Sequence, residues 1–518
     1  MRLPETYNEI RNMVFAEEGN KYPGRALVQM ELNPGYERAK TRLLPHIRTI
    51  NEAHLIMLAE QEIITHEDAK RIMEVLLQID YDAYRNSSYS GQFEDLYFQM
   101  EDEIVRKTDG IGGNLHLARS RNDMCLAWSR MVVREELLLL IKCLVGLQNT
   151  VTLFAEEHRE TLYVIHTHTQ HAQPSFLGHY FLGIVDVLDR NIARLQHAYQ
   201  AANSSPMGAA AITTSAFPIS RHRVAELAGF ESVIENSYDA IGNCDYYSQT
   251  ASAISLCALD LGRIITDMLL WATEELKMIR VADGYISTSS IMPQKRNPIA
   301  LEHLRASLSV VKGLADTVLG VFFKAPYGDI SDYEDIEDTM SSAMELLNKN
   351  LELFNAVIAT MDVDKKLLAD RAYESFSVVT EIADEVYRSY HIPFRKAHHF
   401  VAQLVKKADQ MNYNLKNISH EFFAQVYLEV FGQPFKEDFT PILKSIDPKN
   451  FVKERNVYGG SGPKAMADMF STANEKISRN LKWYKSKVEM LEDVQNKREQ
   501  EIKKIINYNL KKERCEFS

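Results

Sequence analysis

The sequence predicts an all-α protein built around a bundle of long helices. Five stretches of about 26 to 37 residues have apolar residues at i, i+3 and i+4 and no proline beyond their first position. Segments typical of β-strands are scarce. Helices of this length with wide apolar stripes cannot all be buried in one small globule, so we expect a bundle that packs against copies of itself. The five stretches are residues 124–158, 176–201, 243–279, 298–323 and 335–361.

The chain length and its breaks predict three domains. At about 150 residues per domain, 518 residues correspond to roughly three. Residues 1–123 form an N-terminal helical domain in this interpretation, with Thr65 as a helix cap and with Gly110, Gly112 and Gly113 as its final breaks. Residues 124–362 form the bundle. Residues 363–518 form a C-terminal domain of shorter helices. Its tail, from Glu475 onward, mixes charges of both signs and predicts an exposed helix or coiled segment rather than a core.

Composition excludes several classes of partner. The net charge is -12, and no basic face with interleaved aromatic residues is present, so a nucleic-acid partner is not expected. The five cysteines have no paired spacing, which is typical of a reducing compartment. The N-terminus has no apolar signal core, and the apolar run 137–147 is interrupted by Lys142 and is too short for a bilayer. We expect a soluble cytoplasmic protein with a small-molecule substrate and no membrane partner.

The clearest candidate for chemistry is the loop at residues 287–298. Ser289 and Ser290 are adjacent hydroxyls, Lys295 is a fixed cation, and the stretch has little apolar surface to bury. Asn297 before Pro298 predicts a helix cap followed by proline at the first helical position, which places Glu302 in the second turn. The free N–H groups of such a helix start favour an anion. An ordinary surface loop is the alternative interpretation.

Three further stretches combine hydroxyls, amides and ionisable groups. Residues 118–123 contain Ser120, Arg121 and Asn122, which are donors suited to carboxylate oxygens, although a solvated charged run is the alternative. Residues 165–174 carry three histidines, yet they lack the helical i, i+4 pair with a glutamate or a cysteine partner, so proton transfer fits better than metal binding. Residues 236–240 look like the start of a long helix.

Together these stretches resemble the argininosuccinate lyase family of the fumarase/aspartase superfamily. The stretch ending at Asp123 resembles the family's L-H-x-A-R-S-R-N-D, and the one beginning at Thr167 resembles T-H-x-Q-x-A-Q-P, which ends on Gln173 and a proline. Residues 236–240 resemble N-S-x-D-A, and residues 289–298 resemble S-S-x-M-P-Q-K-x-N-P. The motifs are collinear over about 400 residues, a spread that makes chance agreement a poor explanation.

The resemblance implies a fold, an assembly and a reaction. The fold is the three-domain fumarase/aspartase type, and the assembly is a homotetramer with a twenty-helix central bundle whose active sites are shared between subunits. The reaction is elimination of fumarate from an N-substituted L-aspartate, with argininosuccinate as the nearest known substrate and a place in arginine biosynthesis. No cofactor or metal is implied.

The resemblance also implies residue roles. Ser289 would take the Cβ proton, and His168, oriented by Glu302, would assist proton transfer at the leaving nitrogen. Lys295 and Asn297 would hold the succinyl carboxylate. The remaining substrate-binding positions are Ser120, Arg121, Asn122, Thr167, Gln173 and Tyr327.

Departures from the family pattern concern the surroundings of the site. Thr288 stands where a glycine precedes the paired serines, and the tail beyond about residue 478 is longer than usual. After Tyr327 the family's Gln and Lys for the arginine end are absent, and six acidic residues lie among twelve positions at 327–338. These acids either face water at a helix start or line the pocket, where they would favour a leaving amine with a cationic end. A lyase for such an amine and a catalytically silent, crystallin-like relative are the alternatives to argininosuccinate cleavage.

Overall fold

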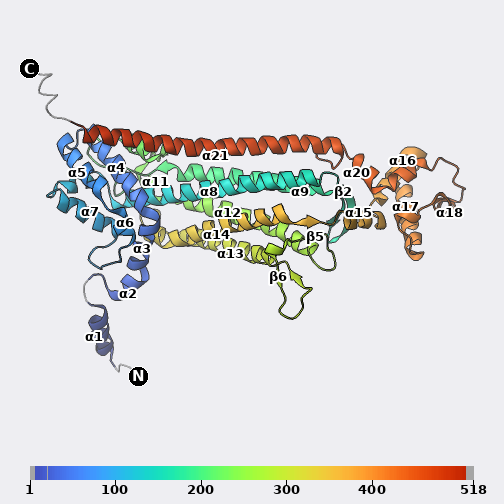
Figure 1. Cartoon of the computed structure of the whole chain (residues 1–518), viewed down its shortest axis with the longest axis horizontal. Coiled ribbons are helices and arrows are strands. Elements are labelled where there is room, and N and C mark those ends of the chain that lie inside the picture. The colour runs from blue at the N-terminus through green and yellow to red at the C-terminus, as the bar shows by residue number, and fades with distance from the viewer. Residues whose placement is uncertain (1–5, 20–21, 509–518) are drawn as a thin grey trace, which may run out of the picture.

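The long helices of the predicted bundle are all present. The computed structural model describes residues 6–19 and 22–508. Five long helices run side by side through the middle of the elongated molecule (Figure 1). They are α8 (Arg121–Glu157), α9 (Leu177–Ala202), α12 (Asp245–Trp271), α13 (Ile299–Phe322) and α14 (Asp332–Thr360). The all-α prediction is therefore confirmed.

The helix ends follow from local chemistry. α8 begins at Arg121 because Ser120 and Asp123 form a reciprocal capping box. α12 ends at Trp271, short of the predicted residue 279, because the chain turns back and the Met278 N–H donates to the Trp271 carbonyl at 2.9 Å. α8 is the one helix among the described residues long and apolar enough to cross a membrane, and 56% of its most apolar window is buried inside the protein. It is a core helix of the bundle.

Short helices at one end of the bundle form a second core. The Thr65 cap is confirmed, because its Oγ accepts from the Asp68 N–H at 3.1 Å. This core also includes residues from the first turns of α8. The helices of this core are α3 (Asn33–Arg38), α4 (Leu44–Glu60), α5 (His66–Gln78), α6 (Tyr81–Arg85) and α7 (Leu96–Lys107), with a π-helical turn at Ala39–Leu43 and a 3-10 turn at Ile111–His116. Before them come α1 (Tyr7–Glu18), α2 (Arg25–Leu27) and a π-helical turn at Val28–Leu32, which bury no side chain.

The other end of the bundle carries a group of shorter helices. They are α15 (Lys365–Glu374), α16 (Val379–Tyr390), α17 (Phe394–Gln410), α18 (His420–Phe431), α19 (Thr440–Ser445) and α20 (Pro448–Lys453), with a 3-10 turn at Leu415–Asn417. The last helix, α21 (Pro463–Ile506), leaves this group and runs back along the bundle to the N-terminal helices (Figure 1). The predicted tail is thus helical, although Ile502 and Ile505 near its end are buried. The domain boundaries at 123/124 and 362/363 stay a prediction.

The strands are short and connect the helices. β1 (Leu162–Thr167) and β2 (Gln170–Phe176) form an antiparallel hairpin between α8 and α9. β6 (Ser287–Thr288) and β7 (Arg296–Asn297) pair antiparallel and close the base of the loop that precedes α13. The remaining pairs are parallel β3 (Ser204–Ser205) with β4 (Ser232–Val233) and antiparallel β5 (Ile279–Arg280) with β8 (Asp362–Val363). Two short helices, α10 (Arg221–Ala228) and α11 (Ser237–Gly242), lie between β3 and α12.

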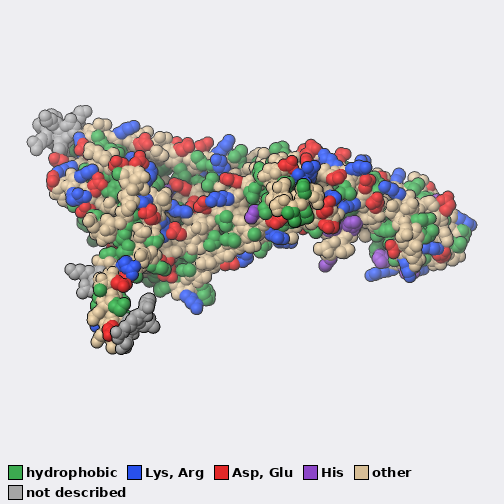
Figure 2. All heavy atoms as spheres, turned by 60° about the horizontal axis from the view of Figure 1, so that its bottom comes forward, with side chains coloured by type: hydrophobic (Ala, Val, Ile, Leu, Met, Phe, Trp, Pro, Cys, Tyr) green, Lys and Arg blue, Asp and Glu red, His purple; other side chains and the backbone are tan. Residues whose placement is uncertain are grey.

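The surface of the bundle retains large apolar side chains. In Figure 2 hydrophobic side chains lie between charged ones along the bundle. The most exposed on the bundle helices include Leu153 at 63% and Val310 at 53%, together with Leu139, Leu256, Leu259 and Leu270. Apolar residues repeated along long helices are typical of a surface that packs against another copy.

Candidate active site

The first group of predicted site residues lies at the start of α8. Ser120 caps the helix, with its Oγ accepting from the Asn122 N–H at 3.3 Å. The Asn122 side-chain amide donates to the Ala211 carbonyl at 3.0 Å. Both side chains are partly exposed. The helix start therefore presents a hydroxyl and an amide at a position where backbone N–H groups favour a carboxylate.

Asp123 anchors this group and was not among the predicted site residues. One carboxylate oxygen accepts from the Ser120 N–H at 2.9 Å. The other accepts from the N–H groups of Gly208 at 2.9 Å and Ala210 at 3.0 Å. Asp123 is fully buried, and burial raises the pKa of its carboxyl to about 6 despite these bonds. The S-x-x-D spacing from Ser120 is a capping-box signature that identifies it from sequence.

Tyr327 joins the short helix α11. Its hydroxyl donates to Asp239 Oδ1 at 2.8 Å, and the Tyr238 hydroxyl donates to the Tyr327 carbonyl at 2.9 Å. Asn236 caps α11, because its Oδ1 accepts from the Tyr238 N–H at 2.8 Å. The prediction that this cap starts a long helix was wrong: α11 ends at Gly242, and the long helix α12 begins afresh at Asp245. α11 packs against α8 at the end of the bundle that carries the N-terminal helices (Figure 1), so Tyr327 belongs to the same end as Ser120.

The second group lies on the β1–β2 hairpin. His168 and Thr169 both have positive φ, 51° and 62°, and they form the two-residue turn between the paired Thr167 and Gln170. Thr167 and His168 are exposed at this tip. The Gln173 amide donates to Thr380 Oγ1 of α16 at 3.1 Å. Histidine side chains are visible at the end of the bundle that carries the hairpin (Figure 2). The turn therefore presents an imidazole that is free to meet a substrate.

The third group lies on the β6–β7 loop. Ser289 Oγ accepts from two backbone N–H groups, those of Ile291 at 3.3 Å and Met292 at 3.1 Å. Lys295 is exposed. The Asn297 amide donates to Ser287 Oγ across the β6–β7 pair at 3.3 Å. The loop therefore surrounds the Ser289 oxygen with two N–H donors and carries the Lys295 ammonium six residues further along the chain.

The prediction that Asn297 caps the following helix was wrong by one residue. Asn297 is part of β7, Pro298 is the residue before the helix, and α13 begins at Ile299. The strand pairing accounts for the difference, since the Asn297 side chain is engaged with Ser287 and not with the helix start. Glu302 consequently lies in the first turn of α13, not the second, and is exposed.

Within one chain, the Ser120 group is far from the β1–β2 hairpin and from the β6–β7 loop. α8 has 37 residues, and at 1.5 Å per residue it separates Ser120 from the hairpin by about 55 Å. The β6–β7 loop projects from the side of the molecule, away from the N-terminal helices (Figure 1). The predicted catalytic residues and the Ser120 group therefore do not form a site within a single subunit.

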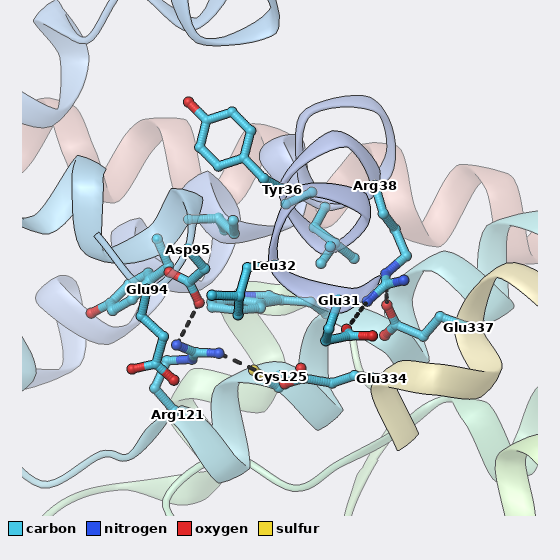
Figure 3. A pocket seen from close by; sticks show the side chains of 16 residues that line it. Glu31, Leu32, Tyr36, Arg38, Glu94, Asp95, Arg121, Cys125, Glu334 and Glu337 are labelled. Atoms are coloured by element: carbon cyan, nitrogen blue, oxygen red, sulfur yellow. Dashed lines mark ion pairs between the residues drawn. The ribbon is translucent and has the colours of Figure 1, made fainter. Parts of the chain in front are cut away.

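A pocket adjoins the Ser120 group and involves Arg121 (Figure 3). Arg121 forms ion pairs with Asp95 and, at 3.7 Å, with Glu334. On the other side Arg38 pairs with Glu337 at 2.9 Å and with Glu31 at 3.6 Å. The cavity has a volume of about 80 Å³, enough for several water molecules or a small polar group.

Carboxylates outnumber arginines in this pocket. Burial raises the pKa values of Glu31, Asp95 and Glu334 and raises that of Glu337 to about 7. Of the acids after Tyr327, Glu334 and Glu337 line this pocket, whereas Asp332, in the first turn of α14, is half-buried and does not line it.

The described residues show no arrangement typical of a metal centre. No three His, Cys, Asp or Glu side chains in residues 6–19 and 22–508 are grouped as ligands would be. Cys125, Cys143, Cys244 and Cys257 are free, and Cys515 lies outside the described residues.

Comparisons with known proteins agree with these motifs. A family model described as lyase matches residues 47–313, and one described as argininosuccinate lyase C-terminal matches residues 376–453. Argininosuccinate lyase of Methanocaldococcus jannaschii is 33% identical over 85% of this chain and 90% of its own length. The chain belongs to the argininosuccinate lyase family. Argininosuccinate lyase 2 of Agrobacterium fabrum is 34% identical over 88% of this chain and 92% of its own length.

Solved structures extend the family likeness to the fold. EDDS lyase in complex with formate superposes with a TM-score of 0.81 and 25% identity, covering 92% of this chain and 96% of that one. A class II fumarase from Schistosoma mansoni has a TM-score of 0.64 and 15% identity over 84% of this chain and 94% of that one, which shows the fold alone. The predicted fumarase/aspartase-type fold is confirmed.

Proposed function

We propose that the protein is a carbon–nitrogen lyase that eliminates fumarate from an N-substituted L-aspartate, with argininosuccinate as the nearest known substrate. Family membership supports this reaction, since the curated relatives named above are argininosuccinate lyases. The observation that carries the proposal is the environment of Ser289 on the β6–β7 loop. Two backbone N–H groups point at its oxygen, so the alkoxide form that a base requires is stabilised.

The proposed reaction moves one proton from carbon and one to nitrogen. The Ser289 alkoxide takes the Cβ proton, the electrons of the C–H bond form the new double bond, and the Cα–N bond breaks with its pair on nitrogen. His168, oriented by Glu302, delivers a proton to that nitrogen, so fumarate and a neutral amine leave. Negative charge builds on the carboxylate next to Cβ. Lys295 and Asn297 are the donors that stabilise it, each worth on the order of 100-fold in rate.

The site would be assembled from several subunits. Because about 55 Å of α8 separates the Ser120 group from the hairpin with His168, the two groups meet only between different chains. A homotetramer with a shared helical bundle supplies such contacts and covers the exposed apolar residues of the bundle. The free cysteines in the described part of the chain fit the cytoplasmic location that the sequence predicts.

Release of fumarate tests the reaction directly. The purified protein is mixed with argininosuccinate and with other N-substituted aspartates, and fumarate is followed by its ultraviolet absorbance. Sustained fumarate formation that stops in the Ser289→Ala variant supports the proposal. If no substituted aspartate yields fumarate, the catalytically silent, crystallin-like alternative holds.

A second candidate differs only in the leaving amine, and the pocket beside Arg121 favours it. Five carboxylates, those of Glu31, Glu94, Asp95, Glu334 and Glu337, line the pocket with two arginines. Such an excess attracts a cation. The indole N–H of Trp128, which also lines the pocket, is buried and has no hydrogen-bond partner. An amine that carries both a cationic group and an acceptor oxygen would satisfy the carboxylates and this donor.

Steady-state kinetics across a panel of aminoalkyl aspartates separates the two candidates. If the pocket selects the amine, argininosuccinate is cleaved with a kcat/KM below about 10,000 per molar per second, the lower end of ordinary enzymes, and a cationic aminoalkyl aspartate is preferred. Glu334→Gln then lowers kcat/KM for the cationic substrate more than for argininosuccinate. The matched control is Asp332→Asn, which changes an acid two residues away that does not line the pocket.

A further inference from the structure

The long helix α21 makes contacts that the proposed reaction does not use. Both family matches end before it, at residues 313 and 453. It runs the length of the bundle and ends against the N-terminal helices (Figure 1). Its last part therefore connects the two ends of the molecule.

The end of α21 is anchored on α4 and α10. Arg498 Nε lies 3.0 Å from Glu52 Oε2 of α4, and its Nη1 donates to the Leu227 carbonyl of α10 at 2.9 Å. The side chains of Arg498 and Glu52 are only 13% and 4% exposed. Leu491 packs at the end of α10, where a Cβ on Gly229 would lie 2.9 Å from Leu491 Cδ2. Because the Arg498–Glu52 pair is largely shielded from water, removing one partner costs more than breaking a surface ion pair.

Further contacts follow along the same helix. Ile502 and Ile505 are buried in the core that contains α4, α5 and α10. Glu501 lies 3.3 Å from Arg223 of α10, and Lys497 pairs with Glu226. The last turns of α21 thus hold one side of α10.

The first residue of α10, Arg221, holds the segment at residues 207–211. Arg221 donates to the Met207 carbonyl at 3.0 Å and to the Ile234 carbonyl at 2.9 Å. Gly208 lies directly against it, since a Cβ there would be 2.7 Å from Arg221 Cγ. This segment supplies the two N–H groups that bind Asp123 and the Ala211 carbonyl that binds the Asn122 amide. An unbroken series of contacts therefore leads from α21 through α10 to the Ser120 group.

We propose that residues 491–506 of α21 act as a positioning strut for the substrate-binding residues at the start of α8. By holding α10 from outside, the strut keeps residues 207–211 where they orient Asp123 and Asn122. Arg498 is in this view a positioning residue, because it touches none of the predicted substrate-binding groups. That the strut affects binding of the succinyl half of the substrate rests on the proposed function. The contact of α21 with residues 207–211 through α10 does not.

Three variants of the full-length protein test the strut. Arg498→Ala removes the anchor on α4 and α10. Arg498→Lys keeps the charge, but an ammonium group lacks the planar guanidinium whose separate nitrogens reach both Glu52 and the Leu227 carbonyl. Arg479→Ala is the matched control, because it removes an ion pair of the same helix that ends on Asp189 of α9 and does not reach α10.

Two readouts are measured on each variant. Hydrogen exchange of the Gly208 and Ala210 amides reports on the bonds to Asp123, and steady-state kinetics reports KM and kcat separately. We expect Arg498→Ala to speed exchange of both amides. We also expect it to raise KM roughly tenfold, because fewer molecules would hold residues 207–211 in the arrangement that binds substrate, and the apparent affinity falls with that fraction. The kcat should change less than about threefold. Arg498→Lys should be intermediate, and Arg479→Ala should match the wild type in both.

Either readout can overturn the proposal. Unchanged exchange at Gly208 and Ala210 in Arg498→Ala contradicts the coupling, whatever the substrate. Faster exchange with unchanged KM contradicts the positioning role. If the wild type releases no fumarate, the proposed function fails, and the exchange measurement alone still decides whether α21 holds this segment.

Discussion

At the residue scale, sequence motifs predicted which candidate side chains share a segment but not the contacts that support them. Ser289, Lys295 and Asn297 do share one loop, and Ser120 and Asn122 do share one helix start. The bonds from Gly208 and Ala210 to Asp123 were missed because these two partners are 85 and 87 residues away. The ion pairs of Arg121 with Asp95 and Glu334 were missed for the same reason. Contacts between distant segments leave no local pattern in a single sequence.

Ser289→Ala tests the proposed base. Removing a positioned base is expected to lower kcat by roughly 100-fold to 10,000-fold. Thermal stability should stay unchanged, because the hydroxyl of a partly exposed loop serine contributes little packing. Turnover and the unfolding temperature are measured together. The control is Ser290→Ala, which removes the neighbouring exposed hydroxyl and should keep activity within about threefold. If Ser290→Ala loses most activity while Ser289→Ala keeps normal turnover, Ser289 is not the base and the proposal has named the wrong serine.

Glu337→Gln tests the electrostatics of the pocket beside Arg121. Burial raises the pKa of Glu337 from 4.5 to about 7, so the folded protein binds more protons than the unfolded chain between these values. The contribution of Glu337 to stability is therefore full below about pH 4.5 and falls as the pH rises to about 7. Glutamine does not titrate. The unfolding temperature of the variant relative to wild type should increase from pH 5 to pH 8.

The matched control for this pH dependence is Glu345→Gln on the same helix. Glu345 is 56% exposed, and Lys349 holds its pKa below its ordinary value, so the stability difference should be nearly flat between pH 5 and pH 8. A flat difference for Glu337→Gln as well would show that this carboxyl is ionised throughout that range.

At the element scale, helical periodicity predicted the long helices well and the connections poorly. The five bundle helices were all located, because their apolar stripes extend over many turns. The two-residue strands β6 and β7 are too short to produce a pattern, and for that reason Asn297 was assigned to a helix cap. The burial of Ile502 and Ile505 was likewise hidden, because the tail around them is mostly charged. The helices that contact this tail, among them α4, α5 and α10, lie hundreds of residues earlier in the chain.

The junction of α8 and α9 supports the hairpin and offers an element-scale test. A Cβ on Gly178 would lie 2.6 Å from the Ala155 carbonyl oxygen and 3.0 Å from Arg159 Cα, so the two helices touch there through backbone. Gly178→Ala should destabilise the protein by roughly 1 to 3 kcal/mol, as overpacking of a close contact does. The unfolding temperature measures the effect.

Gly183→Ala on the same helix is its control. An added Cβ at Gly183 meets nothing within 4 Å, and alanine is favoured over glycine in a helix by up to about 1 kcal/mol. Gly183→Ala should therefore be neutral or slightly stabilising. Equal effects of the two substitutions would mean that the close approach at Gly178 does not constrain the helices.

At the scale of the whole molecule, both the exposed apolar residues and the separation of the site groups point to association. Leu153 and Val310 are 63% and 53% exposed on helices that otherwise bury their apolar faces. We expect a tetramer in sedimentation at micromolar concentration. Leu153→Glu combined with Val310→Glu should shift the protein toward smaller species, and a wild-type monomer would contradict the proposed assembly.

The central claim is that each active site combines groups from different chains, and mixing two inactive variants tests it most directly. Ser289→Ala removes the base from the β6–β7 loop, and Asn122→Ala removes an amide from the start of α8. The two variants are unfolded, mixed in equal amounts and refolded, and fumarate formation is compared with each variant refolded alone. If the two groups come from different chains, about one quarter of the sites in random hybrids are intact, and activity near one quarter of wild type returns. If both groups act within one chain, no mixture contains an intact site, and the mixed sample stays as inactive as its parents.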